Sequence, residues 1–270
     1  MLNDIKKALL ERFPEQESFE NIAYPPKYEG RFVEKIVHPD VYIWDAWTAI
    51  HEKDITLYAL SSPRKFYEIE GLNLENSRDF LPHHWRKFQS YDNGESWLDY
   101  GVCMTPRLGT DYFDSRSIWT GSIMEHDGQW IAGYTGIRDM NNELQAKLQA
   151  LGLAVLNEEG TFSRLIDTPF SCPLRDYDEI KSKGYYLGPY ETLGNHVGEE
   201  GGSILAWRDP YLIKDRNGTI NVFWGAKENR DGQQRPAIGH GTLTDPFGDC
   251  KFNLHLPINL PGASDFTEAE

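Results

Sequence analysis

The sequence predicts an all-β fold, built from the kind of strand pairs that make the blades of a β-propeller, with a few peripheral helices. Three observations support this prediction. Three stretches repeat one plan of strand, polar turn and strand, and helical periodicity is sparse. Aromatic and turn-forming residues are also abundant, with 8 Trp, 14 Tyr, 13 Phe, 24 Gly and 15 Pro among 270 residues. Together they indicate many short strands joined by turns.

The three repeats follow one another along the chain. They cover residues 41–62, 117–136 and 206–226, and each carries a tryptophan near the start of its first strand, at Trp44, Trp119 and Trp207. These tryptophans lie 75 and 88 residues apart. That period exceeds the repeat length of a solenoid and suits four-stranded propeller blades joined by long loops.

Two kinds of turn are recognisable in the sequence. The second and third repeats turn at Asp127-Gly128 and Asn217-Gly218, dipeptides whose residues accept the positive φ of a tight hairpin. Residues 90–97 (SYDNGESW) fit the spacing of an Asp-box, a hairpin in which an aspartate caps the turn and a tryptophan packs beneath it. We expect this second turn to be structural.

Helices are expected only at the periphery of the fold. Residues 4–13, 142–151 and 177–183 carry the apolar spacing of short helices. We therefore predict an N-terminal helical or extended segment over residues 1–30, followed by a propeller domain over residues 31–270.

Composition limits the classes of function. Asp and Glu number 42 against 27 Lys and Arg, a formal net charge of −15, so the chain lacks the basic face that nucleic-acid binding requires. No apolar run is long enough to span a membrane, and no signal-peptide core is visible. The 3 scattered cysteines fit neither a disulfide framework nor a zinc site. We expect a cytoplasmic or unconventionally secreted protein that binds a small molecule or an oligosaccharide, with no nucleic-acid or membrane partner.

Each repeat places polar residues early in its first strand, the strand that lines the axis of a propeller. These residues are Asp45, the segment 119–122 and the pair Arg208-Asp209. Both aspartates stand among apolar and aromatic neighbours, where a carboxylate is costly unless it is paired or used. Two structural alternatives stay open, an Asp45 that holds a turn and an Arg208–Asp209 ion pair. Their matching places in the repeat favour a shared site.

These segments resemble the motifs of glycoside hydrolase family 68, the levansucrases and inulosucrases. Residues 44–47 (WDAW) are similar to the W-D-x-W motif of that family, and residues 119–122 (WTGS) to its W-S-G-S segment. Residues 207–210 (WRDP) match the R-D-P motif that it shares with family 32, the invertases. Near the end of the chain, Glu268-Ala269-Glu270 is similar to the E-x-E part of the general-acid segment.

The resemblance implies a five-bladed β-propeller that cleaves sucrose or fructans with retention of configuration. Such a ring needs roughly two blades more than this chain supplies, so we expect an incomplete propeller of about three blades in a fragment of a longer protein. The 8 histidines show no H-E-x-x-H motif and no facing pair, and adjacent residues such as His83 and His84 point apart on a strand, so we expect no catalytic metal and no cofactor. Some family 68 members hold a structural calcium, but no motif here indicates one.

The resemblance also assigns roles to residues. Asp45 would be the nucleophile that forms a fructosyl-enzyme intermediate, Asp209 the transition-state stabiliser and Glu270 the general acid/base. Five further residues would contact the substrate: Trp44, Trp119, Ser122, Arg208 and Glu268. Water as the acceptor would make the enzyme a hydrolase, and a sugar would make it a fructosyltransferase.

Two other functions remain open at the level of sequence. One is an arabinan- or xylan-active furanosidase of the family 43 type, which shares the propeller and its three carboxylates but inverts configuration. The other is a carbohydrate-binding propeller that lacks the acid. Glu191 and His196 lie in the long segment before the Arg-Asp-Pro motif, and we regard them as candidates for the rim of the site.

Overall fold

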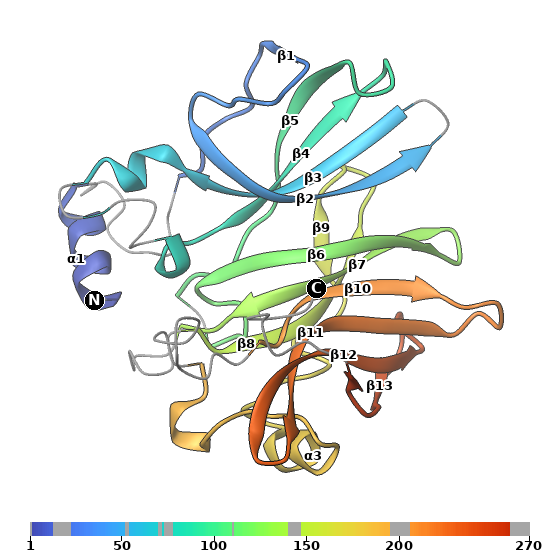
Figure 1. Cartoon of the computed structure of the whole chain (residues 1–270). Helices are drawn as coiled ribbons and strands as arrows, with labels where there is room; N and C mark the ends of the chain where they lie inside the picture. The colour runs from blue at the N-terminus through green and yellow to red at the C-terminus, as the bar shows by residue number, and fades with distance from the viewer. Residues whose placement is uncertain are drawn as a thin grey trace.

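The computed structural model describes residues 2–12, 23–51, 54–69, 72, 78–109, 111–139, 147–194 and 206–259. Their strands form three antiparallel sheets, each a meander of the kind that makes a propeller blade (Figure 1). The prediction of a mostly-β protein with few helices is therefore confirmed.

The first sheet runs in the order β1-β5-β4-β3-β2, and its strands are β1 (Arg31–Val33), β2 (Val41–His51), β3 (Asp54–Pro63), β4 (His84–Ser90) and β5 (Ser96–Met104). The second runs β6-β7-β8-β9, with β6 (Ser117–His126), β7 (Gln129–Ile137), β8 (Gln149–Leu156) and β9 (Phe162–Arg164). The third runs β10-β11-β12-β13, and β14 pairs with β12; its strands are β10 (Arg208–Lys214), β11 (Ile220–Arg230), β12 (Gln233–Thr244), β13 (Lys251–Leu254) and β14 (Ile258–Asn259).

The predicted hairpin turns form, although they differ in detail. Asp127 and Gly128 both take positive φ, 50° and 80°, at the turn from β6 to β7. At the turn from β10 to β11 only Gly218 does so, with φ 85°. There the carboxylate of Asp215 accepts the N–H groups of Asn217 and Thr219, at 2.8 and 3.0 Å, and stabilises the turn in place of a second left-handed residue.

The Asp-box prediction is also confirmed at the turn from β4 to β5. The Asp92 carboxylate accepts hydrogen bonds from the Ser96 amide at 2.8 Å and from the hydroxyls of Ser90 and Ser96. These donors, Ser96 first, lower the pKa of Asp92 to about 2. The Trp97 ring lies beneath the turn at Gly94. The motif therefore stabilises the hairpin that joins β4 to β5.

The helices confirm two of three predictions. Helix α1 (Leu2–Arg12) and helix α3 (Tyr177–Ser182) lie outside the sheets (Figure 1). Short 3-10 turns cover Arg64–Tyr67, Arg78–Phe80 and Tyr190–Thr192. No helix among the described residues is long and apolar enough to cross a membrane.

The helix predicted over residues 142–151 is wrong where the structure describes it. Residues 147–148 are not helical, and residues 149–151 begin strand β8. Ala150, Leu151, Leu153 and Ala154 of this strand are all buried. A strand covered on both faces is apolar without alternation, so its pattern resembles that of a buried helix.

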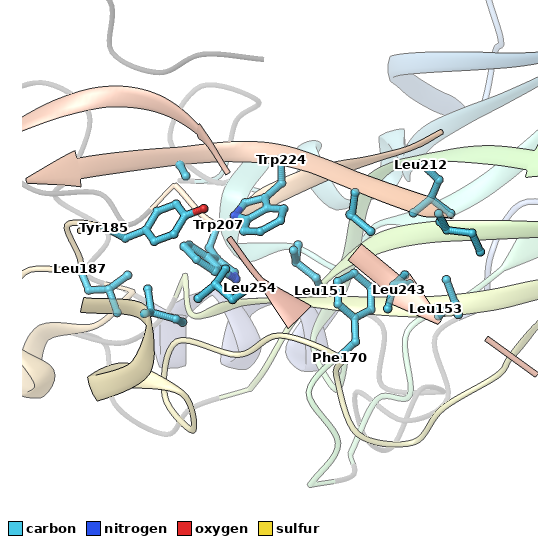
Figure 2. Close-up of a cluster of buried hydrophobic side chains, with 14 of the residues drawn as sticks. Leu151, Leu153, Phe170, Tyr185, Leu187, Trp207, Leu212, Trp224, Leu243 and Leu254 are labelled. Atoms are coloured by element: carbon cyan, nitrogen blue, oxygen red, sulfur yellow. The ribbon is translucent and has the colours of Figure 1, made fainter. Parts of the chain in front are cut away.

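The hydrophobic core consists mainly of two layers between the sheets. Large aromatic side chains fill the layer between the first and second sheets, among them Tyr58, Trp85, Phe113, Tyr134 and Phe162. Leucines and tryptophans fill the layer between the second and third sheets (Figure 2). Each sheet therefore packs face to face on the next, as propeller blades do.

Candidate active site

The three motif segments lie on β2, β6 and β10, and each of these strands is bulged at its motif. The regular pairing skips Asp45 in β2, Thr120 in β6 and the Asp209-Pro210 dipeptide in β10. Strand β6 lies between β2 and β10 (Figure 1), so the structure brings the three bulges together. A bulge turns a side chain away from its regular direction and is common beside active sites.

The backbone at these bulges is unusual. Asp45 and Asp209 both have positive φ, 23° and 60°, a region that residues other than glycine rarely adopt. Gly121 is required for a steric reason, because a Cβ atom there would lie 1.9 Å from the carbonyl oxygen of Gly133. Only glycine therefore fits the third position of the WTGS segment.

Asp45 is exposed to solvent, and its carboxylate contacts the neighbouring sheet. Its Oδ2 atom accepts a hydrogen bond of 2.6 Å from the Thr120 hydroxyl. The nucleophile predicted from the sequence is thus tied to the WTGS segment, and its orientation depends on the second sheet.

Thr135 on β7 connects the second bulge to the third. Its side chain is fully buried. Its hydroxyl donates to the carbonyl oxygen of Thr120 at 3.3 Å and accepts from the Asp209 amide at 2.8 Å. A chain of contacts therefore runs from Asp45 through Thr120 and Thr135 to the backbone of Asp209.

Ser122 makes a second connection between β6 and β10. Its buried hydroxyl donates to the Pro210 carbonyl at 2.9 Å and accepts from the Leu212 amide at 2.8 Å. These bonds satisfy backbone groups of β10, which is an edge strand of its sheet. Ser122 therefore joins the two sheets, and its binding of a sugar hydroxyl stays a prediction.

Arg208 and Asp209 lie close to each other at the start of β10. The Arg208 Nε atom is 3.6 Å from Asp209 Oδ2, and their side chains are 9% and 19% exposed. This distance is consistent with the structural ion pair that the sequence left open as an alternative. The same pair presents a shielded carboxylate and a guanidinium side by side, which suits hydrogen bonding to sugar hydroxyls.

Trp207 anchors this segment in the core. Its ring is fully buried and packs against the rings of Tyr185 and Trp224, at centroid distances of 5.2 and 5.0 Å (Figure 2). Its indole N–H donates to the Ser171 hydroxyl at 3.1 Å. The start of β10 is therefore fixed by packing and by a hydrogen bond.

Trp44 and Trp119 are half-buried beside the first two bulges. The Trp44 ring lies edge-on to the His83 ring at 5.3 Å, and His83 Nδ1 is 3.0 Å from the Ser117 hydroxyl. Burial lowers the pKa of His83 to about 3, so this imidazole is neutral at ordinary pH. The Trp119 carbonyl accepts the indole N–H of Trp85 at 3.0 Å.

Four further residues are predicted from the sequence to belong to the site. Glu268, Glu270 and His196 lie outside the described residues, whereas Glu191 is exposed in the turn Tyr190–Thr192. The boundary between residues 30 and 31 stays a prediction. Within the described ranges, no group of three or more His, Cys, Asp or Glu side chains is placed to hold a metal ion.

Residues 66–235 match the family model described as "Glycosyl hydrolases family 32 N-terminal domain". The match covers more than half of the chain and includes Thr120, Thr135 and Asp209. The chain belongs to this family. Its Arg-Asp-Pro segment thus stands in a family 32 domain, while the closer likeness to family 68 stays a prediction. No curated protein sequence matches the chain.

Solved structures of other glycoside hydrolases share the fold of this family 32 domain. They include the GH32 β-fructofuranosidase BmSUC1 of Bombyx mori (TM-score 0.51, 15% identity, 93% of this chain and 41% of that one). Zg3597, a family 117 glycoside hydrolase of Zobellia galactanivorans, has TM-score 0.50, 14% identity and coverages of 79% and 56%. RS223-β-xylosidase has a TM-score of 0.50 and 15% identity, and the match covers 82% of this chain and 60% of that one. The chain thus spans about half the length of these proteins.

Sequence reasoning missed two residues of the site. Thr135 lies in the second strand of its repeat, in the apolar run QWIAGYTGI, where a threonine is an ordinary strand residue. His83 stands directly before His84, and neither belongs to a recognisable motif. Nothing local distinguishes either residue, because their partners lie 15 to 74 positions away.

Proposed function

We propose that this family 32 domain cleaves sucrose or fructans with retention of configuration, through a fructosyl-enzyme intermediate. One observation carries the proposal. Asp45 and Asp209, the two described aspartates that the motifs single out, occupy matching bulges, and the Asp45 carboxylate is connected through Thr120 and Thr135 to the backbone amide of Asp209. A retaining mechanism requires a nucleophilic carboxylate and an acid/base, and the resemblance adds Asp209 as a further carboxylate that stabilises the transition state.

In this mechanism the Asp45 carboxylate attacks the anomeric carbon of the fructosyl unit. The bond from that carbon to the leaving-group oxygen breaks, and Glu270 donates a proton to this oxygen. The Asp209 carboxylate accepts hydrogen bonds from fructosyl hydroxyls, and its charge stabilises the oxocarbenium-like transition state. Glu270 then removes a proton from the acceptor, which attacks the anomeric carbon and releases Asp45.

The remaining contacts of the substrate are assigned by the same resemblance. Trp44 and Trp119 would pack against the apolar face of the sugar, and Arg208 and Glu268 would bind its hydroxyls. We further propose that the three sheets form part of a five-bladed ring. Water as the acceptor gives hydrolysis, and a second sugar gives fructosyl transfer.

A second candidate is a furanosidase active on arabinan or xylan. It is favoured by the likeness to RS223-β-xylosidase, whose TM-score is within 0.01 of that of BmSUC1. The family 32 match favours the fructoside instead. A carbohydrate-binding domain without catalysis is the third candidate.

The test is the release of glucose and fructose from sucrose, with arabinan and xylan oligosaccharides assayed in parallel. The Asp45→Asn variant should lose about a thousandfold in kcat, roughly 4 kcal/mol of transition-state stabilisation. Asp54→Asn, an exposed aspartate on the partner strand β3, is the matched control and should keep full activity. Release of pentoses but not of fructose would favour the second candidate, and binding without cleavage would favour the third.

A further inference from the structure

The second sheet carries a cavity that the proposed mechanism does not use. Its volume is about 340 Å³, within the size range of ligand sites. Phe113, Leu148 and Ala150 contribute buried apolar side chains to its lining, and Asp111 and Tyr112 contribute exposed ones. A lining of apolar side chains with a few polar groups is typical of a small-molecule site.

The charged side chains of this cavity fall into two groups. Asp167 accepts a hydrogen bond of 2.8 Å from Arg107, and Arg175 donates one of 2.7 Å to Asp176. Arg138 and Asp111 differ, because the side chain of neither makes a hydrogen bond or ion pair with any described residue. A half-buried guanidinium and a carboxylate thus line one cavity, and neither side chain is paired with a described residue.

This pair of groups selects the chemistry of a ligand. A guanidinium donates paired hydrogen bonds and a carboxylate accepts them, so together they suit a molecule with several hydroxyls. Their opposite charges cancel, and an anionic ligand would be repelled by Asp111. The Tyr112 ring supplies an aromatic face, held on one side by the Arg107 guanidinium at 3.5 Å from its centroid.

The cavity lies toward the end of the second sheet at which β6 begins. Arg138 directly follows β7, whose last residue, Ile137, pairs with Ser117 at the start of β6. Thr120, the partner of Asp45, is the fourth residue of β6. At about 3.3 Å per residue and 4.8 Å per strand, the cavity and Thr120 are on the order of 15 Å apart.

We propose that this cavity is a distal subsite for a sugar unit of the same oligosaccharide whose fructosyl end lies at Asp45. The inference rests on the proposed function for its substrate class. It makes the protein selective for fructan chains over sucrose, because sucrose is too short to reach Arg138.

The decisive experiment measures binding and turnover separately. Calorimetry measures how tightly the Asp45→Asn protein binds a long inulin-type oligosaccharide and how tightly it binds sucrose. The measurement is repeated after the further change Arg138→Ala. In the otherwise unaltered protein, Arg138→Ala should lower kcat/KM for the oligosaccharide about tenfold and leave sucrose unchanged. Arg216→Ala, an exposed arginine at the third hairpin, is the matched control. Tyr112→Ala is the second variant and should give the same selective loss.

The outcomes separate the two proposals. Equal loss on both substrates, or no loss on either, would overturn the subsite while the furanosidase stands. A wild-type protein that cleaves neither substrate, but whose oligosaccharide binding weakens with Arg138→Ala, would overturn the proposed function and keep the subsite. No change in oligosaccharide binding would contradict the subsite whatever the activity. Thermal unfolding of each variant identifies a loss caused by misfolding.

Discussion

The two interfaces between the sheets hold their aspartates in different ways. Between the second and third sheets, the backbone of Asp209 is held by the buried hydroxyl of Thr135, next to the fully buried Trp207. Between the first and second sheets, Asp45 is exposed and contacts the hydroxyl of Thr120. The backbone of Asp209, the proposed stabiliser, is therefore held by a buried group, whereas Asp45, the predicted nucleophile, is exposed and reaches the neighbouring sheet through a hydrogen bond at the surface. Substitutions between the second and third sheets should therefore mainly lower stability, and substitutions around Asp45 should mainly lower activity.

The largest effect should come from Trp207. Trp207→Ala removes a buried ring and the hydrogen bond to Ser171, so the free energy of unfolding should fall by about 3–5 kcal/mol. Trp44→Ala, at the half-buried equivalent in the first repeat, should cost clearly less. Urea denaturation of both variants measures the difference. Equal losses of unfolding free energy would mean that the two tryptophans are equally well packed and would contradict the difference between the two interfaces.

The next effect should come from Thr135. Thr135→Val keeps the shape of the side chain but leaves the Asp209 amide without its partner, which should cost about 1–3 kcal/mol of unfolding free energy. Thr135→Ser keeps the hydroxyl and should recover most of it. If Val and Ser behave alike in urea denaturation, the hydroxyl does not hold the third bulge.

The sequence predicts the local features of the fold better than the contacts between its sheets. The turns at Asp127-Gly128 and Asp92 follow from local chemistry, and the motifs around Asp45 and Asp209 are short contiguous segments. Thr135 cannot be found this way, because its contact with the Asp209 amide joins residues 74 positions apart. Strand β8 was mistaken for the end of a helix because both its faces are buried. Local patterns therefore predict the hairpins and the aspartates, and the packing of one sheet on another decides the rest.

The first interface should also be the one that responds to acid. Burial lowers the pKa of His83 from 6.5 to about 3, so its neutral form stabilises the fold above pH 6.5. As the pH falls from 6.5 toward 3, the unfolded chain takes up the proton first, and stability drops by up to about 1.4 kcal/mol per pH unit. Burial lowers the pKa of His84 as well, so two histidines contribute to the slope.

The variant His83→Asn isolates the first of these contributions. Asparagine can still hydrogen-bond Ser117 but does not titrate, so unfolding free energy should depend less steeply on pH between 6.5 and 4 than in the wild type. The measurement is urea denaturation at several pH values. Parallel slopes for the two proteins would show that His83 is not buried in its neutral form.

The smallest effect on stability should come from Thr120. Its hydrogen bond to Asp45 lies at the surface, so Thr120→Val should lower the unfolding free energy by only about 0.5–1 kcal/mol. If Asp45 is the nucleophile, the same change should lower kcat more than it alters KM, because the carboxylate loses the group that orients it. Thr120→Ser should restore kcat. A loss of stability as large as that of Thr135→Val, with kcat unchanged, would place Thr120 among the structural residues and remove the difference between the two interfaces.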